Sequence, residues 1–215
     1  MGTSGVAHNG GVSSPLEELP VGETTHRQLD FLLASHRLTS VYRLNRLLDG
    51  SRSESSAEHS WHLALSAIAL AADHAPGVDL ATVVTMLLIH DLVEIDAGDV
   101  PIYDEQRRLD IVAEEHRAAV ALFARLPPAQ GAALLSLWRE FEEAQTEAAR
   151  FARAVDRLQP LLLHWASDGA AWAGRSVTVG QERRLMAAIE DFWPSLGPVA
   201  DALVTDAHRR GMLAD

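Results

Sequence analysis

Apolar side chains recur at three- and four-residue steps along most of the chain, which is the spacing that predicts helices. The first stretch with this spacing begins at Thr25 and contains Leu29, Leu32, Leu33, Leu38, Val41 and Tyr42. Before it, residues 1–22 are rich in Gly, Ser and other small residues and offer little apolar surface to bury. The pattern therefore predicts a flexible tail over 1–22 and a single all-α domain over 23–215.

The stretch 56–74 is apolar on nearly every side. One stripe contains Trp61, Ala64, Leu65, Ile68, Ala71 and Ala72, and the opposite side carries Leu63, Ala67 and Leu70. Ser55 or Ser56 can cap its first turn, which also contains Glu58. His59 lies at helical spacing from Leu63 and points inward with it. We expect a helix at the centre of the fold.

Caps and breakers divide the rest of the chain into further helices. Asp79 can cap a helix that ends near Leu92, and its length favours a helix over a strand. Pro160 interrupts the helical repeat over 147–167 and removes a hydrogen bond to the carbonyl of Asp156, where we expect a kink. Helices are also predicted over 109–126, from Pro128 onward, and within 181–215, with a loop over 169–180.

Residues 86–101 place five ionisable groups behind an apolar run. The run reaches His90 and Asp91, and Glu94, Asp96 and Asp99 follow. Burying so many ionisable groups is costly unless they are paired or bind an ion. The segment is therefore a candidate site rather than plain core.

Four residues, His59, His90, Asp91 and Asp156, form a mixed nitrogen and oxygen set. Such a set suits Mn²⁺, Co²⁺, Fe²⁺, Ni²⁺ or Zn²⁺, and the absence of cysteine excludes thiolate ligands and disulfides. The predicted helices bring the set together from three segments, and Asp156 lies at the expected kink. His62 shares a face with His59 and is an alternative ligand.

The charge balance limits the partners. All 18 basic residues are Arg, and 30 acidic residues bring the net charge to −12. A chain this acidic lacks the surface for gripping a nucleic-acid polymer, although one or two local Arg side chains can bind a small phosphorylated molecule. No run approaches the ~18 apolar residues of a membrane span, and no signal peptide is visible, so we expect a cytoplasmic location and no membrane partner.

Three strings carry a family resemblance: AEHSWHLAL at 57–65, HDLVEIDAGD at 90–99 and AVDRLQP at 154–160. Together they resemble the HD-domain metal-dependent phosphohydrolases, and within them the small HD proteins that include the 5′-deoxynucleotidases. The resemblance covers about residues 25–168. It implies a helical bundle with one divalent metal ion between central helices, bound by His59, His90, Asp91 and Asp156; Mg²⁺ joins the candidate ions.

The resemblance also implies roles for residues beside the metal. Glu94 and Asp99 match the spacing of two functional acids, one to orient or deprotonate water and one to protonate the leaving alkoxide, in an order left open. Arg43 is the first choice for binding phosphate and Arg46 the second. Arg52 is a rim candidate, and Asp96 can simply cap a turn.

These implications favour an enzyme that releases phosphate from a small monoester, best a (deoxy)nucleoside 5′-monophosphate. One alternative is an HD-fold enzyme for a nucleoside triphosphate or another phosphorylated metabolite, including a phosphonate oxidised at a two-iron site. Another is a non-catalytic, metal-binding regulatory helical protein. All-α domains of this size often dimerise, which leaves a homodimer open; contact candidates are Trp138, Trp165, Trp172 and Trp193.

Overall fold

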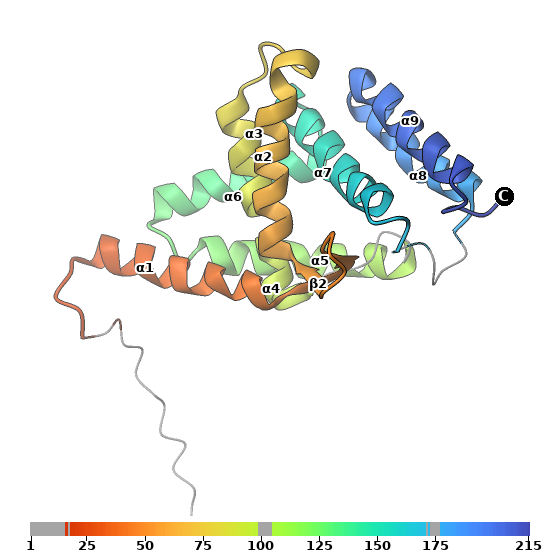
Figure 1. The fold of residues 1–215 in the computed structure, drawn as a ribbon. Coiled ribbons are helices and arrows are strands. Elements are labelled where there is room, and N and C mark those ends of the chain that lie inside the picture. Colours follow the sequence, from red (N-terminus) through yellow and green to blue (C-terminus); the bar gives the residue numbers. More distant parts are fainter. Residues whose placement is uncertain (1–15, 17, 99–104, 171, 173–176) are drawn as a thin grey trace, which may run out of the picture.

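The computed structural model describes residues 16, 18–98, 105–170, 172 and 177–215, without the side chains of 105–110. Most of the predicted tail, Asp99, and residues 171 and 173–176 of the predicted loop lie outside this part. Helices dominate what is described, and the small sheet has two strands (Figure 1). The predicted all-α class is confirmed.

The first helical stretch is shorter than its apolar repeat. Helix α1 spans Glu23–His36, and a 3₁₀ turn, η1, follows over Arg37–Ser40. The chain then forms strand β1 (Tyr42–Arg46), which pairs antiparallel with β2 (Ser53–Ser55). The expected helical repeat through Tyr42 is therefore wrong, because this end of the stretch alternates in exposure as a strand does.

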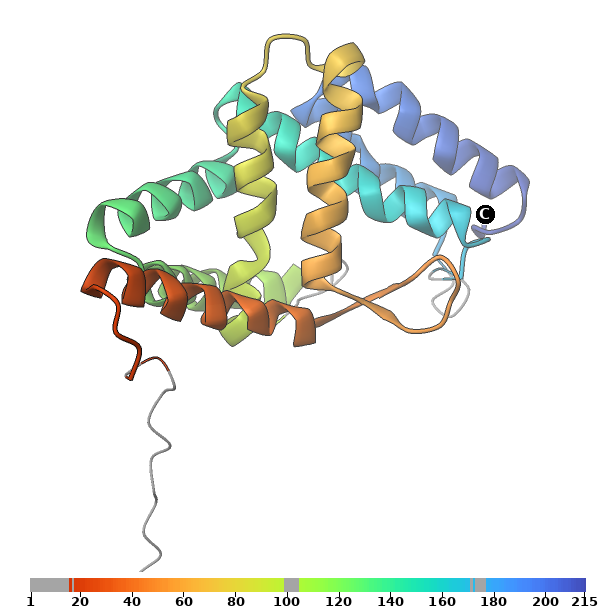
Figure 2. The ribbon, with the colours of Figure 1, turned by 60° about the vertical axis from the view of Figure 1, so that its left-hand side comes forward.

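Helix α2 spans Ser56–His74, as predicted. Ser55 is its N-cap and forms a capping box with Glu58. Helix α3, Leu80–Ile89, begins after Asp79, whose side chain accepts a hydrogen bond from the backbone of Thr82. The two helices lie side by side (Figure 2), with α1 running across one end of them.

Helix α2 is less central than its composition suggests. Trp61, Leu65 and Ile68 are 61%, 48% and 53% exposed. The buried side is the one that carries His59, Leu63 and Ala67. The expectation of a central helix is therefore wrong for the stripe that carries these three residues.

The chain changes from an α-helix to a 3₁₀ helix where α3 ends. A 3₁₀ helix, η2, covers His90–Val93, and the short helix α4 covers Glu94–Ala97. Gly98 follows α4 with φ 82°, a conformation that favours glycine. The 3₁₀ turn and the short helix keep His90, Asp91 and Glu94 buried on consecutive turns.

The remaining helices close the bundle. They are α5 (Glu105–Phe123), α6 (Pro128–Glu143), α7 (Glu147–Ala166), α8 (Val179–Phe192) and α9 (Gly197–Arg209), with η3 (Pro194–Leu196) before α9. Helix α7 runs through Pro160 without interruption. Trp138 and Trp172 are buried within the chain, so neither is available as the contact residue considered above. No helix of the described residues has the length and apolarity that a membrane crossing needs.

Two apolar cores flank the segment that starts at His90. One joins α2, α3 and α7 to the C-terminal helices and includes Leu63, Met86 and Phe151. The other joins α1, η2, α5 and α6 and includes Leu92 and Phe123. The ionisable cluster lies where these cores meet, on a well-packed frame.

Candidate metal centre

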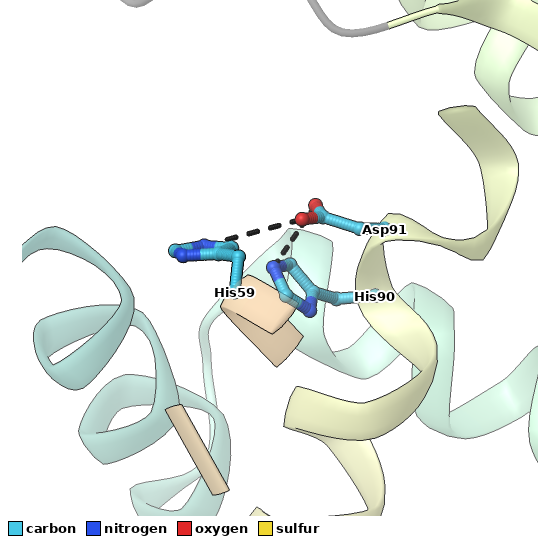
Figure 3. A group of neighbouring side chains, drawn as sticks. All are labelled: His59, His90 and Asp91. Atoms are coloured by element: carbon cyan, nitrogen blue, oxygen red, sulfur yellow. Dashed lines mark ion pairs between the residues drawn. The ribbon is translucent and has the colours of Figure 1, made fainter. Parts of the chain in front are cut away.

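Helix α2 and the 3₁₀ helix η2, which follows α3, bring His59, His90 and Asp91 together. One ligand-type atom from each lies within 4.8 Å of the other two, and all three residues are buried (Figure 3). His90 Nε2 is 3.0 Å from Asp91 Oδ1, and His59 Nε2 is 3.9 Å from Asp91 Oδ2. Three donors at these distances can share one ion.

Asp156 completes the cluster from α7. Its Oδ1 lies 3.1 Å from His59 Nε2 and 3.7 Å from His90 Nε2. The structure thus brings together all four residues that the sequence singled out as ligands. Their joint role as ligands stays a prediction.

The surroundings of His90 leave one ring nitrogen for an ion. Its Nδ1 lies 2.9 Å from the carbonyl oxygen of Leu87, to which it donates, and its Nε2 is buried without a hydrogen-bond partner in the described chain. The ring packs on Phe141 with centroids 4.9 Å apart, and Trp138 Nε1 donates to the His90 carbonyl at 3.1 Å. A buried ring nitrogen directed at two carboxylates is a position that a cation can occupy in place of a proton.

His59 and His62 face different partners. His59 Nε2 points at the cluster, whereas His62 Nδ1 lies 3.0 Å from Gln159 Nε2. The geometry therefore favours His59 over His62 as the ligand from α2. Gln159 was not singled out from the sequence, although it lies one helical turn after Asp156.

Charge within the cluster shifts the pKa values of its members. Burial disfavours the protonated imidazole, yet the carboxylates of Asp91 and Asp156 raise the pKa of His90 well above its ordinary value. Burial disfavours carboxylates too, yet nearby cations, His90 foremost, lower the pKa of Asp91 to about 2. In Asp156 burial is outweighed by His59 and His90, so its pKa falls well below the ordinary value. Both carboxylates are ionised at neutral pH, as metal ligation requires.

The three arginines considered for the site have different partners in the structure. Arg43 Nη1 lies 3.0 Å from Asp91 Oδ2 and 3.9 Å from Glu94 Oε1. Arg46 instead donates to the carbonyl of Gly50 and is exposed. Arg52 pairs with Glu58 at the start of α2. Of the three, Arg43 is the one that the structure brings to the cluster.

The two described acids after Asp91 also differ. Glu94 is buried, and its Oε2 accepts a hydrogen bond of 2.6 Å from Ser56 Oγ. Asp96 is exposed and lies 3.5 Å from Arg37. Ser56 was missed as a site residue, although it stands one turn before His59 on the same helix. Asp99 lies outside the described residues.

The fold and the buried cluster are those of a known protein family. The HD domain family model matches residues 35–193, and the chain belongs to that family. The resemblance noted in the three sequence strings is confirmed.

Three individual proteins are similar to the chain in sequence or in fold. A predicted metal-dependent phosphohydrolase from Magnetospirillum magnetotacticum MS-1, known as a crystal structure, is 43% identical with a TM-score of 0.83 and covers 89% of this chain and 96% of that one. The 5′-deoxynucleotidase HDDC2 of Bos taurus is 26% identical over 142 residues, 66% of this chain and 68% of that protein. The PH0347 protein from Pyrococcus horikoshii OT3 shares the fold, with 20% identity, a TM-score of 0.59 and coverage of 81% and 99%.

Proposed function

We propose that this chain is a divalent-metal-dependent phosphohydrolase that releases inorganic phosphate from a small phosphate monoester, best a (deoxy)nucleoside 5′-monophosphate. The observation that carries the proposal is the buried cluster of His59, His90, Asp91 and Asp156 with Arg43 beside it. The metal-dependent phosphohydrolase and the 5′-deoxynucleotidase among its relatives support the class and the substrate respectively.

The residues present fit a divalent ion. Two imidazole Nε2 atoms and two carboxylates converge, and His90 Nε2 has no hydrogen-bond partner in the described chain. The donor set suits Mn²⁺, Co²⁺, Fe²⁺, Ni²⁺, Zn²⁺ or Mg²⁺. An ion held there would supply Lewis acidity, lowering the pKa of a nearby water and polarising a phosphoryl oxygen.

Glu94 is positioned to orient or deprotonate a water molecule. Ser56 holds one carboxylate oxygen at 2.6 Å, and Arg43 lies 3.9 Å from the other. A carboxylate fixed in this way can orient a water molecule or take its proton. Asp99, which lies outside the described residues, remains our candidate for protonating the leaving alkoxide.

Arg43 supplies the positive charge for the phosphate. Its side chain is 16% exposed, so it is shielded from water while its neighbour Asp91 lies at 3.0 Å. A guanidinium can donate two parallel hydrogen bonds to a phosphate. One Arg and one divalent ion suit a terminal phosphate dianion, whereas a nucleic-acid strand requires many basic contacts.

A hydrolysis screen tests the proposal. Metal-depleted protein is supplied with Mn²⁺, Co²⁺, Mg²⁺ or Zn²⁺ and offered nucleoside 5′-monophosphates, triphosphates, non-nucleotide esters and DNA. We expect metal-dependent phosphate release from one or more monophosphates and none from internal phosphodiesters. Release from triphosphates or non-nucleotide esters alone would move the substrate to another phosphorylated metabolite. A silent screen with metal bound would favour a regulatory protein.

A further inference from the structure

Gln159 lies behind His59, on the side away from the cluster. In Figure 3 one ring nitrogen of His59 faces Asp91 and the other faces away from it. The far nitrogen, Nδ1, lies 3.1 Å from Gln159 Oε1. His59 is 0% and Gln159 2% exposed, so water does not compete for this contact.

The amide of Gln159 has one orientation that satisfies its neighbours. Its Nε2 lies 3.1 Å from Glu54 Oε1 and 3.0 Å from His62 Nδ1. Only the NH₂ end can donate to two acceptors, here Glu54 Oε1 and His62 Nδ1. Turning the amide over would set Gln159 Oε1 against Glu54 Oε1, at a buried position where Glu54 is 3% exposed.

This orientation selects a tautomer of His59. With the NH₂ end facing Glu54, Oε1 faces His59 and accepts the Nδ1 proton. His59 Nε2 then faces the cluster, 3.1 Å from Asp156 Oδ1, which accepts a hydrogen bond from it, and 3.9 Å from Asp91 Oδ2. An ion bound there would take the place of the proton on Nε2, while Nδ1 keeps its own proton toward Gln159. Glu54 thus acts on the cluster through Gln159, and its other oxygen, Oε2, lies 3.9 Å from His59 Nδ1.

We propose that Gln159 is a positioning residue that fixes the Nδ1–H tautomer and the ring direction of His59 for metal binding, and that Glu54 fixes the orientation of Gln159. The inference rests on the metal site of the proposed function. It adds two residues that the cluster itself does not contain. Loss of such an outer partner typically weakens metal binding by about 10- to 100-fold.

The test measures the dissociation constant for Zn²⁺ by competition with a chelator, on the full chain. Gln159→Leu should weaken binding by about 10- to 100-fold. Glu54→Gln should weaken it less, because an amide facing an amide can pair either way round. Asn45→Leu is the matched control: it removes another amide–imidazole contact, of 2.9 Å to His164, and should leave the constant unchanged.

An exchange of the two side chains separates positioning from packing. In Glu54→Gln/Gln159→Glu the new carboxylate still accepts the His59 proton and meets an amide, so zinc affinity should return close to that of the wild type. Gln159→Glu alone leaves two buried carboxyl groups facing each other and should lower the free energy of unfolding. Failure of the double exchange to recover affinity, with the fold intact, would contradict the inference.

Ring ¹⁵N spectra of the wild-type protein, with and without Zn²⁺, give an independent reading. His59 should carry a proton on Nδ1 in both states. An Nδ1 without a proton would overturn the inference whether or not any variant folds. Wild-type protein that binds no divalent ion would overturn the proposed function, whereas tight binding by wild type and Gln159→Leu alike would overturn only the positioning role.

Discussion

At the scale of single residues, Glu94 and Arg43 form a pair beside the four prospective ligands. Ser56 holds Glu94 by a hydrogen bond of 2.6 Å, and Arg43 reaches both Glu94 and Asp91. Because Glu94 already has these partners, it can keep its place without binding the ion. We therefore propose that metal binding and proton transfer fall to different carboxylates.

Replacing Glu94 by Gln separates these roles. The amide oxygen can still accept from Ser56, so shape and metal content should be preserved, while phosphate release falls by on the order of 10²-fold or more. Elemental analysis and a phosphate assay on the same preparation check both parts. Loss of the metal in this variant would show that Glu94 is a ligand instead.

Arg43→Ala should weaken phosphate release with the metal still bound, because the variant lacks the guanidinium that lies 3.0 Å from Asp91. Arg46→Ala is the matched control, since Arg46 lies on the same strand as Arg43 but is exposed and donates to the carbonyl of Gly50. The assay compares kcat/KM of the two variants. An equal loss in both, or a larger one for Arg46, would mean that the wrong arginine was chosen.

At the scale of secondary-structure elements, the start of α2 sets the position of His59. Ser55 caps the helix, Ser56 contacts Glu94, and Glu58 closes the capping box. Arg52, from the hairpin side, bonds Glu58 at 2.7 Å. Sequence predicted this boundary well because cap and helix former are adjacent in the chain.

The charge of Glu58 should appear in the pH dependence of stability. The hydrogen bond from Arg52 foremost lowers its pKa from 4.5 to about 2. A carboxylate whose pKa is lower in the folded than in the unfolded state stabilises the fold at pH values above its unfolded-state pKa. This stabilisation is lost as the pH falls toward the folded-state pKa. Glu58→Gln, which keeps a capping side chain, should therefore cost under about 1 kcal/mol at pH 7, since the pair is partly exposed.

That cost should shrink as the pH falls from 4.5 toward 2. Urea unfolding of metal-depleted wild type and Glu58→Gln across this range measures it. A difference between the two proteins that grows in acid would contradict the assignment of the pKa.

Strand β1 shows where local pattern is insufficient. Val41 and Tyr42 continue the apolar repeat of α1, and the same residues also suit a strand. What decides between them is pairing with β2 across the turn, Tyr42 opposite Ser55. In a helix, Arg43 and Arg46 would lie three residues apart on one face. In a strand they lie on opposite faces, so Arg43 can face the cluster while Arg46 faces away.

At the scale of the whole molecule, the ligand candidates could be predicted from sequence and their outer partners could not. His59, His90, Asp91 and Asp156 stand in recognisable strings. Glu54 and Gln159 are 105 residues apart, and nothing local in either stretch shows that they meet. Such contacts depend on how β2 and α7 pack, which the apolar pattern does not specify.

The buried cluster should also make global stability depend on metal. His59, His90 and the two Asp carboxylates are held together in the folded chain and are dispersed in the unfolded one, so an ion binds the folded state preferentially. At a free ion concentration 100 times the dissociation constant, the gain is about 2.7 kcal/mol. Tm measured with added Zn²⁺ or Mn²⁺ should rise, and Asp91→Ala should abolish the rise. An equal rise in Asp91→Ala would place the ion elsewhere.

Titrating metal-depleted protein with its activating ion, while measuring phosphate release from a nucleoside 5′-monophosphate, tests the central claim most directly. We predict that release is absent without metal, rises in proportion to added ion and saturates near one equivalent per chain. Asp91→Ala and Asp156→Ala should shift or abolish this rise. Full activity in metal-depleted wild type, or an unchanged titration in both variants, would contradict a metal-dependent phosphohydrolase built on this cluster.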